Sequence, residues 1–96
     1  MLPKFRSPTH PGEILKEEFL KPLGVSQSAL ALHLGWTHAK VNEIVNEKRG
    51  ITPESALLLA DAFGTTPEFW MNLQLNYDLW HAMQEHEKMP KLKNTG

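Results

Sequence analysis

Repeated start and stop signals for short helices restrict the fold of this chain more than any other feature. Segments with apolar residues at helical spacing begin at a serine or threonine, whose side chain caps a helix N-terminus. These caps are Ser26, Thr37, Thr52 and Thr66. Glycines, which readily adopt the left-handed conformation of a helix C-terminus, close segments at Gly24, Gly35 and Gly64. The pattern leaves no credible strand, and we predict an all-α fold, a compact five-helix bundle.

The chain divides into one helical domain with two non-helical ends. Residues 1–10 contain prolines and no apolar period, so we expect an extended N-terminal arm. Residues 11–87 form the domain, whose first helix begins at Pro11 and ends near Pro22 and Gly24. Its last helix runs to about residue 86, and residues 88–96 are expected to form a flexible tail. A length of 96 residues fits a single domain with a modest core.

Composition limits the compartment and the partners. The chain has no cysteine, which removes disulfides, thiolate chemistry and cysteine-based metal sites, and favours a cytoplasmic location. Its longest apolar run is "ALLLA", far shorter than the roughly 20 residues that span a bilayer, so no membrane partner is expected. The N-terminus lacks the apolar core of a signal peptide. Because the net charge is −1, nucleic-acid binding must rest on a local patch.

Two short helices joined by a glycine turn form a helix-turn-helix pattern across "VSQSALALHLGWTHAKVNEIVNEK". The second helix places Val41, Ile44 and Val45 on one face, while its other face is polar. In such a motif the second helix enters the major groove of DNA with its N-terminal end first. A mixed polar face can also be simply solvated, and the same geometry occurs in proteins that bind no DNA.

The residues that we assign to DNA contact combine hydrogen-bonding side chains with positions on or beside this polar face. Lys40 suits guanine or a phosphate, Asn42 suits base edges, and Glu43 suits cytosine. Gln27 can contact a phosphate and brace the second helix, and the loop cations suit flanking phosphates. The full set is Gln27, Thr37, His38, Ala39, Lys40, Asn42, Glu43, Lys48 and Arg49.

The last helix carries more aromatic surface than a domain of this size covers easily. Phe69, Trp70 and Leu73 are expected to fill the bundle core. Tyr77 and Trp80, together with Leu73, are the candidate dimer interface, because aromatic residues are enriched at interface cores. A dimer would double the base pairs that one short recognition helix reads.

The sequence offers no enzyme site. His81, Glu85 and His86 lie close on one helix, but "HAMQEH" is not a zinc motif and no further ligand has suitable spacing. Nucleophile-elbow and phosphate-loop motifs are absent as well. We therefore expect neither an enzyme nor a bound metal or other cofactor.

Several motifs in residues 9–80 together resemble one family. They are "HPGEIL", "VNEIVNEKRGIT" and "FGTTPEFWMNLQLNYDL", which look like the HigA antitoxins, a group of Xre/Cro-like helix-turn-helix proteins also known as virulence-associated protein I or plasmid maintenance antidote proteins. The resemblance implies a lambda-repressor-like DNA-binding domain and a homodimer on palindromic double-stranded operator DNA. It also implies autorepression and a HigB-like ribonuclease toxin as a protein partner.

Two points stay open beside the resemblance. A stand-alone transcriptional regulator without a toxin would share the same DNA-reading face. Trp36 departs from the wider family, where small or polar residues are usual, and we expect its ring to pack under the turn rather than to lean on DNA.

Overall fold

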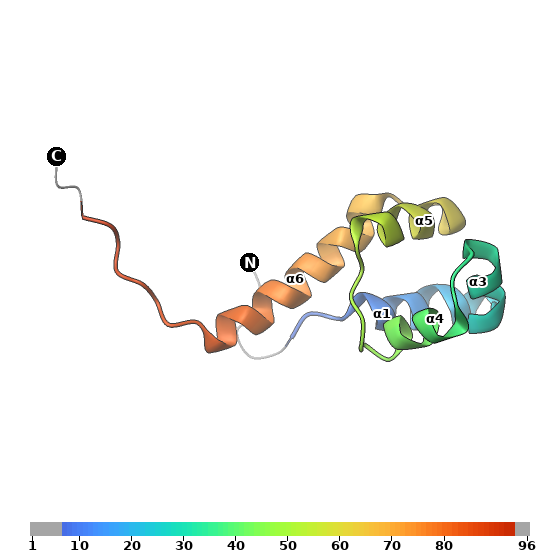
Figure 1. Cartoon of the computed structure of the whole chain (residues 1–96), viewed down its shortest axis with the longest axis horizontal. Helices are drawn as coiled ribbons and strands as arrows, with labels where there is room; N and C mark the ends of the chain where they lie inside the picture. The colour runs from blue at the N-terminus through green and yellow to red at the C-terminus, as the bar shows by residue number, and fades with distance from the viewer. Residues whose placement is uncertain (1–6, 94–96) are drawn as a thin grey trace.

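The computed structural model describes residues 7–93 and contains five helical rods and no strand in that range (Figure 1). The first rod is continuous and consists of α1 (Pro11–Ile14), the π-helical η1 (Leu15–Leu20) and α2 (Lys21–Leu23). The other rods are α3 (Gln27–Leu34), α4 (His38–Val45), α5 (Pro53–Phe63) and α6 (Pro67–Glu85). The predicted all-α, five-helix architecture is confirmed.

Side-chain caps fix where four of the rods begin. Ser26 Oγ accepts from the Ala29 N–H at 3.0 Å, and Thr37 Oγ1 accepts from the Lys40 N–H at 3.1 Å. The same bond recurs at the starts of α5 and α6, from Thr52 and Thr66. The predicted glycine ends are also confirmed, because Gly24, Gly35 and Gly64 all have φ between 66° and 72°.

Trp70 is the centre of the core and is fully buried. The rings of Phe19 and Phe63 pack near it, with centroids 5.2 and 6.4 Å away. Its indole Nε1–H donates to Thr65 Oγ1 at 2.7 Å, so the buried polar atom has a partner. Phe69 lies at the edge of this cluster and is 37% exposed. Trp70 is therefore the core residue that the sequence predicts, and Phe69 closes only the rim.

The first rod does not end at Pro22, which corrects the prediction that Pro22 helps to terminate it. Pro22 lies inside α2, and the helix ends one residue later before Gly24. A proline lacks the N–H that an α-helix needs. Here the preceding π-helical segment has already shifted the backbone hydrogen bonds by one residue, since the Lys21 N–H donates to the Lys16 carbonyl, five residues back. The rod therefore accommodates the proline without breaking.

Gln74 joins α6 to the loop that leaves α4. Its side chain is almost fully buried, and its Oε1 accepts from the Ile51 N–H at 2.7 Å. Its Nε2 donates to Asp78 Oδ1 at 2.8 Å. Gly50 lies directly beneath the amide, where a Cβ would approach it to 2.9 Å. This one side chain thus holds the last helix against the end of the helix-turn-helix segment.

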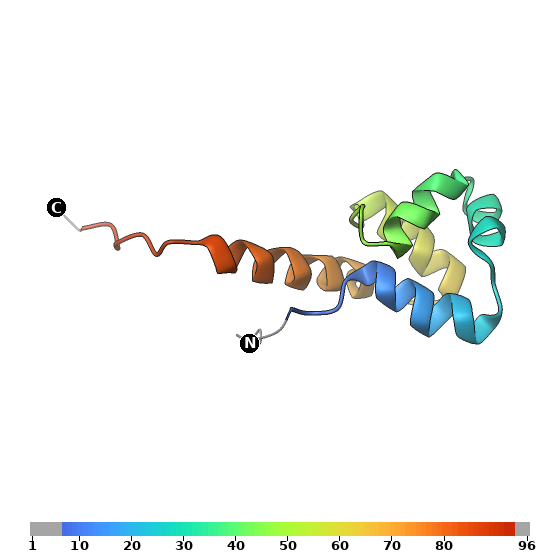
Figure 2. The same ribbon diagram turned by 90° about the horizontal axis from the view of Figure 1, so that it is seen from below.

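The far half of α6 extends beyond the bundle and leads into an exposed C-terminal segment (Figures 1 and 2). Residues 86–93 form neither helix nor strand and are exposed, and residues 94–96 lie outside the described range. The flexible tail at residues 88–96 stays a prediction. At the other end, residues 7–10 precede α1 without helix, while Lys4 and Arg6 of the expected arm lie outside the described residues. No helix within 7–93 is long and apolar enough to span a membrane.

Candidate nucleic-acid interface

The apolar face of α4 presses the helix against the first rod. Val41 and Ile44 are fully buried, and Val45 is almost so. Gly12 of α1 approaches the backbone of Ile44 so closely that an added Cβ would lie 1.7 Å from its carbonyl oxygen. This contact requires glycine and fixes how α4 is rotated. The opposite, polar face of α4 therefore points outward, as predicted.

The turn between α3 and α4 is built from three short-range signals. Gly35 adopts φ of 72°, which ends α3, and Thr37 caps α4. Between them, Trp36 donates its backbone N–H to the Ala31 carbonyl at 2.9 Å. Its ring is half-buried and packs against the core. The predicted packing role of Trp36 is thus confirmed, and the ring also forms a platform beside α4.

Two side chains of α4 are held by neighbours from outside the helix. Lys40 Nζ lies 4.3 Å from the centroid of the Trp36 ring, a cation–π contact. Asn42 Nδ2 donates to Gln27 Oε1 of α3 at 3.1 Å. The predicted brace from Gln27 to the second helix is confirmed. Both contacts reduce the rotamer freedom that these side chains would lose on contact with a ligand.

Glu43 is paired with Arg49 from the loop after α4. Arg49 Nε donates to Glu43 Oε1 at 3.0 Å, and Arg49 Nη2 lies 2.7 Å from the same oxygen. The sequence did not reveal this pair, because the loop conformation that brings Arg49 back depends on Glu47 at φ of 62°. Lys48 stands exposed in the same loop, beside α4.

The structure gathers the predicted DNA-contacting residues on α4, its cap, the start of α3 and the loop after α4. His38 and Ala39 are exposed on the first turn of α4. Lys40 and Glu43 are half-buried, and Asn42 is exposed. The candidate dimer residues lie apart from this face on α6. Leu73 is half-buried against the core, as also predicted, and Tyr77 and Trp80 are half-buried farther along the helix.

The α6 helix carries an exposed apolar stripe that the residue pattern did not predict. Leu75, Leu79 and Met83 are 59%, 47% and 54% exposed and recur every four residues. Apolar residues surround almost the whole of α6, so their spacing alone does not show which side the bundle covers. Their role as an interface stays untested, as does that of Tyr77 and Trp80.

His10 is buried where the chain enters α1, a role that its residue type alone does not predict. Its side chain is 4% exposed, and its Nδ1 accepts from the Gly12 N–H at 2.9 Å, capping α1. Its ring meets Tyr77 edge-on at 4.7 Å. Burial lowers the pKa of His10, an effect that Glu47 and Asp78 partly oppose. In the sequence, this cap is indicated only by the position of His10 directly before Pro11 and Gly12.

His81, which the sequence places near Glu85 and His86 without a zinc motif, lies against aromatic rings. Nowhere in residues 7–93 do three or more metal-ligating side chains come together. His81 instead contacts the Tyr77 and Trp80 rings, at centroid distances of 4.3 and 5.0 Å.

Here α3 and α4 are two capped helices joined by a glycine turn, and the polar face of α4 points outward. This arrangement defines a helix-turn-helix DNA-binding domain. The helix-turn-helix family matches residues 16–70. The chain is 49% identical over 80 residues to virulence-associated protein I of Dichelobacter nodosus, covering 83% of this chain and 74% of that protein. It is 40% identical over 86 residues to antitoxin HigA-1 of Vibrio cholerae, covering 90% and 81%. The chain therefore belongs to the HigA antitoxin family of helix-turn-helix proteins.

A solved structure with DNA shares the fold. It is the Pseudomonas aeruginosa antitoxin HigA with the higBA promoter, 45% identical to this chain with a TM-score of 0.80. The match covers 88% of this chain and 99% of that one.

Proposed function

We propose that this protein is the antitoxin of a toxin–antitoxin pair, a homodimer that reads a palindromic operator and represses its own operon. The observation that carries the proposal is the pre-arranged face of α4, where the Gln27–Asn42 bond and the Trp36–Lys40 contact hold two hydrogen-bonding side chains outward. The relatives named as antitoxins, one of them solved with promoter DNA, support the same role.

On DNA, α4 enters the major groove with His38 and Ala39 leading. Lys40 donates to guanine or to a phosphate, and the orientation of the Asn42 amide is fixed toward a base edge. The carboxylate of Glu43 is engaged by Arg49, which favours a role in aiming Arg49 at a flanking phosphate over direct reading of cytosine.

A dimer through α6 places two copies of α4 on successive turns of the duplex, about 34 Å apart. The candidate contacts are Leu73, Tyr77 and Trp80, and the exposed stripe of Leu75, Leu79 and Met83 offers a further apolar side of the same helix. Pairing through a helix on the side away from α4 leaves both reading faces open.

The protein partner that we propose is a HigB-like ribonuclease toxin, and the chain itself acts by binding, without catalysis, in the cytoplasm. The antitoxin names of the relatives support the toxin. A stand-alone regulator is the other candidate, and expression of the neighbouring gene separates the two. Growth arrest that this chain relieves supports the pair, whereas a harmless neighbour supports the regulator.

Fluorescence anisotropy with the chain's own upstream promoter tests the DNA role. We expect tight binding that weakens steeply with salt, and weak binding to a scrambled duplex. Lys40→Glu should weaken operator binding at least tenfold, since one good base contact contributes about 1–3 kcal/mol. Gln84→Ala, which removes an exposed amide near the end of α6, is the control. Equal affinity for both duplexes would remove the repressor role.

A further inference from the structure

The α5 helix and the first turn of α6 carry exposed acidic side chains and no lysine or arginine. Between Gly50 and Glu87 the sequence contains no lysine or arginine. Glu54 and Asp61 are exposed on α5, and Glu68 is exposed in the first turn of α6, which packs on α5. We call these three carboxylates, with Leu57 between the first two, the acidic surface. Leu57 is 55% exposed, so the acidic surface also has an apolar centre.

The C-terminal tail has the complementary chemistry. Residues 88–93 read "KMPKLK" and are all exposed. Its lysines alternate with apolar side chains, of which Met89 is 78% and Leu92 is 97% exposed. An almost fully exposed leucine among three lysines suits a surface that offers carboxylates around a leucine.

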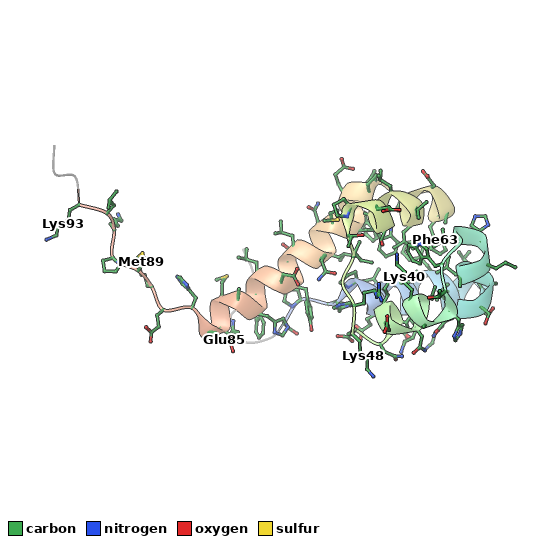
Figure 3. All side chains as sticks on the ribbon, in the orientation of Figure 1. Lys40, Lys48, Phe63, Glu85, Met89 and Lys93 are labelled. Carbon is green, nitrogen blue, oxygen red and sulfur yellow. The ribbon has the colours of Figure 1, made fainter. Side chains whose placement is uncertain are left out.

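The tail leads away from the acidic surface of its own chain. The 19 residues of α6 span about 28 Å, and the acidic surface lies at the beginning of that helix. Beyond Glu85 the tail continues away from the bundle, as the positions of Met89, Lys93 and Phe63 show (Figure 3). To bind the acidic surface of its own chain the tail would have to reverse direction at the end of α6, whereas the same surface on a second molecule requires no reversal.

The exposed stripe of α6 supplies the geometry for a second copy. When two α6 helices pair antiparallel about Leu79, Glu68 lies about 16 Å from the two-fold axis. On the partner helix, Glu85 lies about 9 Å from the axis, and an extended tail at about 3.3 Å per residue carries Lys88 to about 19 Å. Lys88 thus reaches the level of Glu68 of the other copy along the axis, from where the following residues can continue toward α5.

We infer that the C-terminal tail of each copy lies across the acidic surface of its partner, with lysines among Glu54, Asp61 and Glu68 and Leu92 near Leu57. The inference rests on the proposed dimer through α6. The α6 helix contains acidic side chains but no lysine or arginine, so the tail supplies the opposite charge. The tail then acts as a strap that selects the antiparallel arrangement.

Cross-linking tests the strap directly, because the chain has no native cysteine. Protein carrying Lys91→Cys is mixed with protein carrying Asp61→Cys and oxidised without DNA. We expect a heterodimeric cross-link in high yield, and little with His38→Cys, an exposed control on the DNA-reading face. Equal yields with both partners, or a monomer throughout, would overturn the inference.

Dimer affinity gives a second, independent measurement. Sedimentation of a chain that ends at Glu87 should show dimerisation weakened roughly tenfold at low salt, as two or three exposed ion pairs would contribute. Changing the three tail lysines to glutamate should weaken it at least as much. Changing the three carboxylates of the acidic surface to lysine as well should restore it, which a purely structural role of the tail would not predict.

Operator binding by the same samples separates the two proposals. If the shortened chain dimerises as tightly as the full chain and still binds operator, the strap is refuted while the repressor role stands. If, in addition, changing the three carboxylates of the acidic surface to lysine abolishes binding of a basic toxin, the acidic surface is the binding site of the toxin. If the strap forms but operator binding is absent, the repressor role fails alone.

Discussion

Replacing Gln74 with methionine tests whether this one side chain holds α6 against the loop that follows α4. Methionine has a similar length but only a weak thioether acceptor in place of the amide oxygen that accepts from the Ile51 N–H at 2.7 Å. A buried N–H left without a partner costs about 1–3 kcal/mol. The second bond ends on the exposed Asp78 and contributes little. We therefore expect the free energy of unfolding to fall by about 2 kcal/mol.

Urea unfolding followed by circular dichroism measures this loss. For a domain of this size, about 2 kcal/mol corresponds to a Tm lowered by roughly 8–16 °C. Gln84→Met is the matched control, because Gln84 is exposed on the same helix, and its effect should stay within about 0.5 kcal/mol. If Gln74→Met were as mild as Gln84→Met, the Ile51 N–H would have to find another partner, and the joint as described would be refuted.

Three further predictions concern the interior, a titrating cap and the reading face. Gly12→Ala should lower the free energy of unfolding by at least about 3 kcal/mol, since its Cβ would overlap the Ile44 carbonyl; a Tm like that of the wild type would contradict this contact. Burial lowers the pKa of His10 below 6.5, so the unfolded chain takes up a proton that the folded chain resists. Stability from this group is complete above pH 6.5 and is lost as the pH falls, and His10→Asn, which keeps a capping acceptor, should flatten that part of the pH profile of urea unfolding. Trp36→Leu should weaken operator binding about three- to tenfold with normal helicity, and its effect should not add to that of Lys40→Ala; full additivity would show that the ring does not position Lys40.

Local signals made most of the fold predictable. The caps at Ser26, Thr37, Thr52 and Thr66 act within three residues, so the sequence contains all that defines them. The burial of Gln74 depends instead on Ile51, which is 23 positions away, and no periodicity reports it. Pro22 was misplaced as a helix end for a related reason, because the shifted ladder that admits it is invisible in residue types.

The reading face was predictable to the extent that it depends on helical periodicity. The inward side of α4 and the Gln27 brace follow from spacing and from the helix-turn-helix pattern. The pairing of Glu43 with Arg49 does not, since it requires a left-handed residue at Glu47. On α6 the same limit applies, because a helix that is apolar nearly all round gives no preferred side.

In the π-helical segment of the first helix, the number of residues is constrained more strongly than their identities. Leu15 and Leu20 are both buried although they are five positions apart, a spacing that puts them on different sides of an α-helix. A π turn closes one residue later and brings them to the same side. Deleting one of the residues 16–18 would restore the α ladder and rotate everything before it by about 100°, moving Gly12 away from Ile44. Aligned relatives should therefore vary freely in identity at the exposed Glu17 and Glu18 while showing no gap there.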